Sequence, residues 1–359
     1  MKKIRLTSIC SPKQWKTIPT KDLLDEGYPV YGANGVIGYC KEYNHTSDTI
    51  IIGCRGSCGN VNIARGKSYI NGNAMCLDDL SSDVDILYLY YFLQNYDFRS
   101  VISGTTIPQV TKQGLEKIDV VVSSKENQRE IVRQLQLLDS IIEERHKELR
   151  YFDALIKSRF IELFGDPVYN TKKLPTKRLA ELGSLDRGRS QHRPRNAPEL
   201  LGGPYPLIQT GEVANAGLYI TGYSNTYSEL GLKQSKMWKA GTLCITIAAN
   251  IAQTSILTFD ACFPDSVVGF IPGDSISAIY MHYWFGFFQK ILEEQAPQVA
   301  QKNINLKILS DLSVVVPNQE QQKDFIAFVE QTDKSKFEIQ QSLEKLEILK
   351  KSLMQQYFG

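Results

Sequence analysis

The chain has 359 residues, enough for two domains that each bury a core of their own. Its 42% hydrophobic and 22% charged residues are those of an ordinary soluble globular protein, and no apolar run approaches the ~18 residues of a membrane span. A net charge of +2 does not by itself indicate a nucleic-acid partner, and the first residues lack the apolar run of a signal peptide, so we expect a cytoplasmic protein.

Short strands and loops are predicted for the first third of the chain. The run Asp48–Gly53 is apolar and β-branched and ends at a turn residue, which is typical of a buried strand. Leu87–Leu93 predicts a short helix, and Ile107–Val110 predicts a turn. We therefore expect a mixed α/β globule before residue 125.

A long amphipathic helix is predicted from Glu126 to Leu163. Its apolar residues recur at alternating steps of four and three, a coiled-coil pattern that only Arg145 interrupts. Gly165 and Pro167 supply a natural end. The apolar positions are Ile131, Leu135, Leu138, Ile142, Leu149, Phe152 and Ile156.

The next segment predicts a second mixed globule. Gly241–Thr246 resembles a buried strand, and Ile279–Phe285 predicts a short helix. Its opening stretch, Lys172 to Pro198, is rich in basic residues. On charge alone, a solvated mobile loop and a phosphate-binding loop are equally open. The basic residues are Lys172, Lys173, Lys177, Arg178, Arg187, Arg189, Arg193 and Arg195.

A second long helix is predicted from Glu320 to Phe358. Its pattern is weaker at the start, where Thr332 and Lys336 face the seam. It recovers in a regular apolar series: Ile339, Leu343, Leu346, Leu349 and Leu353. A helix of roughly 36 residues would be about 54 Å long and could not bury such a stripe alone.

The end of the chain repeats its middle at a constant offset of 194 positions. Val120–Val122 recur as Val314–Val316, and Gln128 recurs as Gln322. Elsewhere the offset varies, so the loops differ in length. We infer two copies of one module with one fold and different surfaces. The same offset relates Leu149, Leu155, Ser158, Phe164 and Gly165 to Leu343, Leu349, Ser352, Phe358 and Gly359.

The predicted fold class is α+β, with two mixed α/β domains separated by two long helices that form an antiparallel coiled coil with pseudo-two-fold symmetry. The alternative is that each helix folds back on its own globule. The expected segments are a first domain at 1–124, a first spacer helix at 125–166, a second domain at 167–317 and a second spacer helix at 318–359. The residues expected to pair the helices or dock subunits are Leu135, Leu138, Ile142, Leu149, Phe152, Leu343, Leu346 and Leu349.

The seven cysteines are scattered and odd in number, which argues against a disulfide framework. Cys54 and Cys58 are the closest pair, and none of the four histidines is near them. We therefore expect reduced thiols and no metal site.

Several motifs, in order and mostly twice, resemble the specificity subunit of a type I restriction–modification system over essentially the whole chain. They are Tyr28–Tyr39, Thr105–Lys112, the helix openings Glu126–Gln128 and Pro317–Gln321, and the closures Phe164-Gly165 and Phe358-Gly359. The chain departs from the family where the second globule lacks the Tyr-Gly-x-Asn-Gly stretch and where Ser123-Ser124-Lys125 replaces a usual proline.

This resemblance implies a non-catalytic subunit of a restriction endonuclease and adenine methyltransferase complex. Its two target recognition domains would each read half of a split double-stranded DNA sequence, and its helices would set the gap and bind two methyltransferase subunits. Restriction–translocase subunits would complete the complex. The resemblance implies no cofactor in this chain; S-adenosylmethionine, ATP and Mg²⁺ are expected on the partner subunits.

Catalytic motifs are incomplete in the sequence. Asp166-Pro167-Val168-Tyr169 follows a long helix and lacks the second proline of an amino-methyltransferase motif. Pro264-Asp265 has no Asp/Glu-x-Lys partner to hold Mg²⁺ as nucleases do. Gly53–Gly59 lacks the Lys-Ser/Thr end of a phosphate loop. A fused enzyme, a scaffold and an autonomous DNA-binding regulator remain as alternatives.

Reading bases in the major groove requires Arg or Lys toward guanine and Asn or Gln toward adenine, while phosphate contacts fix the register. Each candidate could equally be a satisfied turn or surface residue. In the first globule they are Tyr31, Asn34, Arg55, Lys67, Gln109 and Lys112. In the second they are Arg187, Arg189, Arg193, Gln209, Thr210, Gln298, Lys302 and Asn303.

Overall fold

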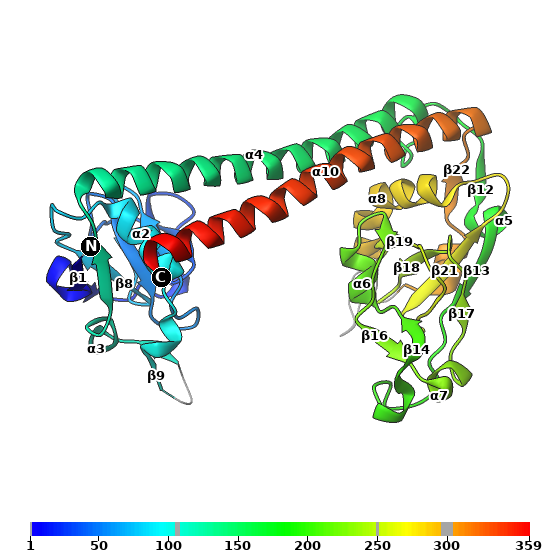
Figure 1. The fold of residues 1–359 in the computed structure, drawn as a ribbon. Helices are drawn as coiled ribbons and strands as arrows, with labels where there is room; N and C mark the ends of the chain where they lie inside the picture. The colour runs from blue at the N-terminus through cyan, green and yellow to red at the C-terminus, as the bar shows by residue number, and fades with distance from the viewer. Residues whose placement is uncertain (1, 105–107, 249–250, 296–303) are drawn as a thin grey trace. The chain divides into compact units, whose positions relative to one another are not determined.

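The computed structural model describes all residues except 1, 105–107, 249–250 and 296–303, and no side chains of 290–295. The chain forms two compact units: unit 1 consists of Met1–Lys147 and Ile339–Gly359, and unit 2 of Glu148–Glu338. Each unit combines a globular domain with parts of both long helices (Figure 1). In the part of the chain that is described, no helix has the length and apolar character to cross a membrane.

Unit 1 is built on two small sheets. The first has the order β2(Ser11–Gln14), β8(Ala74–Asp78), β5(Thr49–Gly53), β6(Val61–Ala64), and all its pairs are antiparallel. The second has the order β4(Gly35–Cys40), β3(Tyr28–Gly32), β7(Tyr69–Ile70). Two-stranded pairs join β1(Lys2–Arg5) to β11(Asp119–Val122) and β9(Ile102–Ser103) to β10(Gln109–Val110). Its shorter helices are α1(Leu6–Ile9), η1(Thr20–Asp22), α2(Ile86–Asn95), η2(Phe98–Ser100) and α3(Lys112–Leu115).

Strand alternation gives the first sheet of unit 1 two buried faces, since successive side chains point to opposite sides. Ile50 and Ile52 join the main core with Met75 and Leu77. The intervening residues, such as Ile51, form a smaller cluster with Ala64, Ile70, Ala74 and Cys76. The predicted strand Asp48–Gly53 is therefore β5, buried along its length.

Unit 2 has the same plan, and its two main sheets have more strands. A five-stranded sheet has the order β13(Gly183–Arg187), β21(Val267–Pro272), β18(Leu243–Thr246), β19(Thr254–Leu257), β15(Tyr219–Ile220). A four-stranded sheet has the order β16(Asn225–Tyr227), β14(Leu201–Leu207), β20(Ala261–Cys262), β17(Met237–Trp238), and β12(Thr176–Arg178) pairs with β22(Ser313–Val315). Its shorter helices are α5(Leu179–Leu182), η3(Pro198–Leu200), α6(Thr210–Asn215), α7(Glu229–Lys233), α8(Ala278–Gln295) and α9(Leu306–Ser310).

Equivalent contacts in the two units confirm the internal repeat. The hydroxyl of Tyr88 donates to the carbonyl of Val121 (2.8 Å), and that of Tyr280 donates to Val315 (2.7 Å). The buried amides of Gln128 and Gln322 each join the start of the long helix to the turn before the shorter one. Gln128 accepts from the amide of Asp85 and donates to the carbonyl of Asp83, and Gln322 accepts from Ser277 and donates to Ser275.

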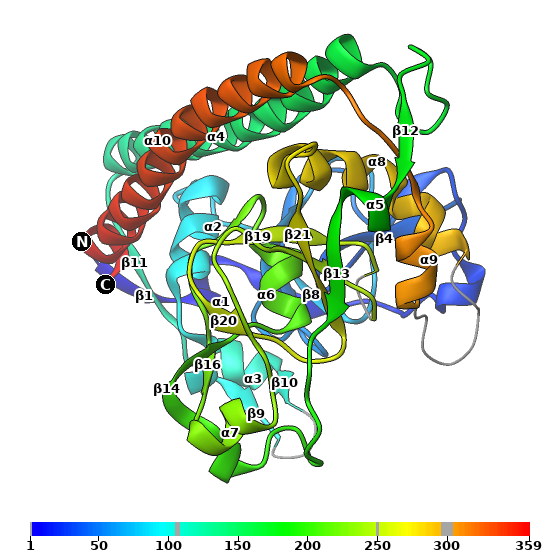
Figure 2. The same cartoon turned by 90° about the vertical axis from the view of Figure 1, so that its right-hand side faces the viewer.

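The two long helices are α4(Lys125–Phe164) and α10(Gln319–Phe358), each of 40 residues and about 60 Å long. They lie side by side in both views (Figures 1 and 2). In unit 1, Lys350 pairs with Asp139 (2.6 Å) and the Tyr357 hydroxyl donates to Gln134 (2.5 Å). Residue numbers rise along α10 as they fall along α4, so the helices are antiparallel, as the sequence predicts.

Both helices contribute to the core of each globular domain. In unit 1, Leu135 of α4 and Phe358 of α10 are buried in one cluster. In unit 2, Phe164 of α4 and Phe325 of α10 are buried together. The repeated Phe-Gly closures now have a reason: Phe358 contacts Tyr88 edge-on, and Phe164 contacts Tyr280 in the same way. Each helix end is therefore part of the opposite copy's core.

The sequence pattern predicts that Leu349 lies in the helix seam, but the structure shows this side chain on the surface. Leu135, Leu138 and Leu343 are buried, and Ile142, Leu149, Phe152 and Leu346 are partly buried. Leu349, in contrast, is 48% exposed. The step after Leu346 is four residues rather than three, which turns Lys350 inward to pair with Asp139. A subunit-docking role for Leu349 stays a prediction.

Candidate nucleic-acid interface

Three of the six candidates in unit 1 line one surface cavity. The segment that contains Arg55 forms an isolated β-bridge with Gln109, and the amide of Val110 donates to the carbonyl of Cys54 (3.1 Å). Arg55, Gln109 and Lys112 border a hollow of 220 Å³ beside β2 and β8. Within the described residues, neither Arg55 nor Lys112 has an ion pair or a side-chain hydrogen bond, so both cations can bind a ligand.

The glycine-rich loop beside this cavity is a tight, thiol-containing turn. A Cβ on Gly53 would lie 2.3 Å from the carbonyl oxygen of Ser57, so only glycine fits there. The Cys58 thiol donates to the carbonyls of Cys54 (3.2 Å) and Pro108 (3.0 Å), which ties the loop to the strand that carries Gln109. Both cysteines are free thiols, and burial raises the pKa of Cys54 to about 12. The contacts of the Cys58 thiol therefore help to position this loop.

The other three candidates of unit 1 lie elsewhere on it. Asn34, in the β3–β4 turn, accepts from the Asn60 amide (2.6 Å). The Tyr31 hydroxyl accepts from the amide of Arg65 (3.3 Å) at the far end of the β5–β6 pair. Lys67 follows that end and lies over the ring of Tyr43, 5.3 Å from its centroid. Lys67 and Arg55 therefore lie at opposite ends of the β5–β6 pair.

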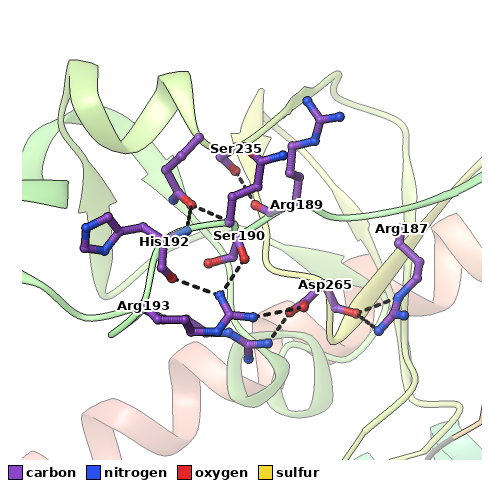
Figure 3. A network of polar contacts seen from close by, with 10 residues as sticks. Arg187, Arg189, Ser190, His192, Arg193, Ser235 and Asp265 are labelled. Atoms are coloured by element: carbon purple, nitrogen blue, oxygen red, sulfur yellow. Dashed lines mark hydrogen bonds and ion pairs between the residues drawn. The ribbon is translucent and has the colours of Figure 1, made fainter.

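In unit 2, arginines of the basic run converge on one aspartate (Figure 3). Arg187 donates to the carbonyl oxygen of Asp265 (2.9 and 2.5 Å), and Arg193 and Arg195 pair with its carboxylate. Arg193 also donates to the carbonyl of Ser190 (2.6 Å). These contacts hold the guanidinium groups in place. From its charge alone, this stretch could be either a mobile loop or a phosphate-binding loop.

Arg189 points away from this cluster in Figure 3. No hydrogen bond or ion pair of its guanidinium is present in the described part of unit 2, and the side chain is exposed. Its neighbour Asp186 accepts from Lys236 (2.8 Å), and this hydrogen bond lowers the pKa of Asp186, with the charge of Arg189 acting in the same direction. Arg189 is therefore an available cation next to a fixed cluster.

Gln209 and Thr210, at the start of α6, line a cavity of 490 Å³ together with Arg195 and Ser190. The amide of Gln209 donates to Glu212 (3.1 Å), so the backbone is fixed while the Gln209 side chain is exposed. The buried Ser190 hydroxyl has no hydrogen-bond partner among the described residues. A ligand that enters this cavity would meet a guanidinium, an amide and a free hydroxyl.

Two residues of this site escaped the sequence reasoning. Arg195 belongs to the basic run but was not among the candidates, and Asp265 was considered only as a nuclease carboxylate. The gathering of arginines by one acid depends on the pairing of β13 with β21, which brings Arg187 close to residue 265. Gln298, Lys302 and Asn303 lie outside the described residues.

The carboxylates considered for catalysis have structural partners. Asp166 caps a turn by accepting from the amides of Val168 (2.8 Å) and Tyr169 (3.3 Å). Asp265 is paired with arginines. Over the described ranges, one group of three His, Cys, Asp or Glu side chains is close enough to share a metal ion, and it contains neither residue. Guanidinium and amide groups, rather than carboxylates, are available at both sites.

A family model described as the type I restriction modification DNA specificity domain matches residues 1–150 and 172–350. A protein of Haemophilus influenzae, provisionally named a type I restriction enzyme specificity subunit, is 21% identical over 84% of this chain and 79% of its own length. The type I restriction enzyme MjaVIII specificity subunit of Methanocaldococcus jannaschii is 22% identical over 72% of this chain and 65% of its own length.

Two solved structures share the fold. The S subunit of a type I restriction–modification system from M. genitalium aligns with a TM-score of 0.61 at 17% identity, covering 100% of this chain and 96% of that chain. A chain from a structure on complex assembly and conformational transition of the type I R-M system aligns with a TM-score of 0.60 at 16% identity, covering 99% and 97%.

Proposed function

Because this chain belongs to the type I restriction–modification DNA specificity family, we propose that it reads a split double-stranded DNA target, one half with each globular domain. The observation that carries the proposal is the repeat itself. Equivalent residues hold the two domains in one framework, while the loops around Arg55 and Arg193 differ in length and chemistry. One framework with two different surfaces is what two unlike half-sites require.

In unit 1, the cavity bordered by Arg55, Gln109 and Lys112 reads bases. An arginine can bind guanine through two hydrogen bonds, and a glutamine can bind adenine in the same manner. The two are joined by a backbone bridge, so their spacing is fixed before DNA binds. Lys112 is exposed at the start of α3 and suits a phosphate contact, which sets register.

In unit 2, Gln209 and Thr210 read bases, and the arginines around Asp265 hold the phosphate backbone. Asp265 orders Arg193 and Arg195 without neutralising Arg189. Such an arrangement fixes several guanidinium groups on one surface although the whole chain carries only +2. Since that net charge attracts DNA weakly, partner subunits that enclose the duplex would supply further affinity.

The long helices dock methyltransferase subunits. Large apolar side chains remain exposed on them, and such groups often mark protein-binding surfaces. Leu155 and Leu349 occupy equivalent positions of the repeat and are both 48% exposed. The other exposed apolar residues are Leu137, Ile141 and Ile348 in unit 1 and Tyr151, Ile161 and Phe337 in unit 2.

Catalysis belongs to the partners in this proposal: methyltransferase subunits carry S-adenosylmethionine, and restriction–translocase subunits use ATP and Mg²⁺. The test is to map methylated motifs in cells that express this chain with its partner subunits. Arg55→Ala should relax one half-site and Arg189→Ala should weaken methylation governed by the other domain, each leaving the opposite half-site intact. The proposal fails if the methylated motif is continuous, or if either substitution alters both halves.

A control separates this proposal from an autonomous DNA-binding regulator. Purified chain without partners should produce no methylation, and adding methyltransferase subunits should restore it with the split motif. Binding of S-adenosylmethionine by the isolated chain would instead favour a fused enzyme. Substitution of the exposed Lys173, outside the proposed contacts, should leave both half-sites unchanged.

A further inference from the structure

Three side chains converge inside unit 1: Cys76 and Asp78 of β8, and His45 from a segment that is distant in the sequence. Their Nε2, Sγ and carboxylate oxygen atoms all lie within 4.8 Å of one another. Cys76 and Asp78 are alternate residues of β8, so their side chains project from the same face of the strand. His45 is brought to them by backbone hydrogen bonds with Ser68 (3.0 and 3.1 Å). Sequence spacing gave no sign of this group.

The hydrogen bonds around His45 fix which ring nitrogen carries a proton. Asn44 accepts from the amide of Ile70 (2.8 Å) through Oδ1 and donates to the carbonyl of Ile70 (3.1 Å) through Nδ2. That pattern orients its amide. The Nδ1 atom of His45 lies 2.7 Å from the same Oδ1 and must therefore donate to it. In a neutral ring, Nε2 is then the atom with the free lone pair.

This lone pair faces another acceptor. Nε2 of His45 lies 2.9 Å from Oδ1 of Asp78, and both side chains are largely shielded, at 9% and 18% exposure. Two lone pairs at this distance need a positive centre between them, either a second proton on the ring or a metal ion. A histidine whose Nδ1 is held by an amide or carbonyl while Nε2 faces outward is the usual arrangement of a metal ligand.

The third group favours the metal ion over the proton. An imidazolium–carboxylate pair needs no thiol, yet Sγ of the fully buried Cys76 lies in the same cluster. The Cys76 thiol donates to the carbonyl of Lys13 (3.0 Å), and burial raises its pKa to about 12, so the thiol keeps its proton until a metal ion binds. Sγ also accepts from the indole N–H of Trp15 (3.2 Å), a contact that would stabilise the thiolate once it forms. Trp15 packs edge-on against the His45 ring, with centroids 5.5 Å apart. One indole thus holds two of the three groups in place.

We propose that His45, Cys76 and Asp78 form a binding site for a zinc-type divalent cation. Imidazole, thiolate and carboxylate together suit Zn²⁺ rather than Mg²⁺ or Ca²⁺, which prefer oxygen. With metal–ligand bonds of about 2.0–2.3 Å, tetrahedral ligand atoms lie roughly 3.5 Å apart. The cluster, whose ligand atoms lie within 4.8 Å of one another, therefore needs only small shifts, in which Nε2 and Oδ1 move apart from their present 2.9 Å. On coordination the Cys76 thiol releases its proton to solvent, and water supplies a fourth ligand.

The proposed ion would join the segment before β5 to the end of β8. The hydrogen bond between His45 and Asp78 already links these two segments. Because the unfolded chain does not preform the site, the binding free energy would add to the stability of unit 1. The site uses none of the residues proposed to contact DNA, so it is independent of the proposed function.

The test uses the full chain after treatment with a chelator, with Co²⁺ as a spectroscopic probe and Zn²⁺ as a thermal probe. We expect one equivalent of Co²⁺ to produce a thiolate-to-metal charge-transfer band, and Zn²⁺ to displace it and raise the melting temperature. Cys76→Ser should abolish the band, and His45→Gln should weaken binding at least tenfold. The matched controls are Cys58→Ser and His146→Gln, which should bind as the parent does.

A parent chain with no cobalt band and no thermal shift would overturn the proposal and leave an imidazolium–carboxylate pair. So would equal binding by the parent and Asp78→Asn, a variant of the same shape. Should the buried variants fail to fold, X-ray absorption at the metal edge of the parent remains decisive. It must show one sulfur ligand together with nitrogen or oxygen; a shell without sulfur would contradict the site.

Discussion

At the residue scale, single buried groups in unit 2 make its stability sensitive to pH. His282 of α8 is partly buried, and its ring lies 3.0 Å from the Thr254 hydroxyl. Burial lowers the pKa of His282 from 6.5 to about 4, and the charge of Lys336 acts in the same direction. The unfolded chain therefore binds a proton at a pH where the folded chain does not, so stability is lost as pH falls below the unfolded value.

We expect unit 2 to lose about 2 kcal/mol of stability between pH 7 and pH 5 from this histidine alone. His282→Gln should flatten that dependence, whereas His146→Gln, an exposed histidine of α4, should retain it. The measurement is the urea midpoint of the transition that exposes Trp238 and Trp284, followed by fluorescence. Equal pH dependence in the parent and His282→Gln would contradict the assignment.

Residue types at the candidate site could be predicted, but their grouping could not. Arg55, Gln109 and Lys112 were proposed separately, and a backbone bridge between distant segments brings them together. Lys67 is near Arg55 in the sequence, yet the β5–β6 hairpin separates the two. His45 was dismissed as a ligand for the same reason. Side chains meet through strand register, and sequence distance does not reveal it.

At the element scale, the long helices show what periodicity can and cannot predict. Their bounds and main apolar stripe follow from the alternating steps, because helical side chains repeat every 3.6 residues. Their antiparallel direction follows from the order of globules and helices along the chain. The four-residue step from Leu346 to Lys350 does not follow from this periodicity. It arises because Lys350 gains an ion pair with Asp139 and lies 6.0 Å from the Tyr91 ring centroid. Apolar periodicity cannot predict a partly buried charge that finds a partner on the other helix.

Leu135 and Leu349 provide a matched pair on these helices. Leu135→Ala should destabilise unit 1 by about 3 kcal/mol, because the residue is fully buried. Leu349→Ala should change stability by less than about 0.5 kcal/mol, since the side chain is exposed. Leu349→Asp should instead reduce copurification with methyltransferase subunits. Urea unfolding and copurification distinguish the two effects; a strong loss of stability in Leu349→Ala would contradict its placement.

The last turn of α10 is a structural part of unit 1. Phe358 is buried against Tyr88 and Phe92 of α2. Phe358→Ala should destabilise unit 1 by about 3–5 kcal/mol, as removal of a core aromatic does. Hydrogen exchange should then accelerate in α2 and not in α8 of unit 2. Lost protection in α8 alone would show that the end of the chain belongs to the other core.

At the scale of the whole molecule, the repeat made the fold predictable. A constant offset of 194 positions implied two equivalent modules, and the paired Tyr88 and Tyr280 contacts confirm the shared framework. The division of compact units could not be inferred, because each core takes residues from both long helices. The segment boundaries proposed from sequence cut through these cores and stay predictions.

We propose that the antiparallel helices set the distance between the two half-sites. Asp139 pairs with Lys350, so four residues further along, Glu143 faces Leu346. Seven residues inserted after Glu143 and seven after Lys345 would lengthen both helices by about 10 Å and preserve the apolar seam.

The decisive measurement is methylated-motif mapping of this paired insertion in the assembled complex, beside a variant with the insertion in α4 alone. We expect the paired variant to methylate the same two half-sites with a wider gap, and the single insertion to disturb helix pairing and lower methylation. An unchanged gap in an active paired variant would contradict the claim, as would a change in either half-site sequence.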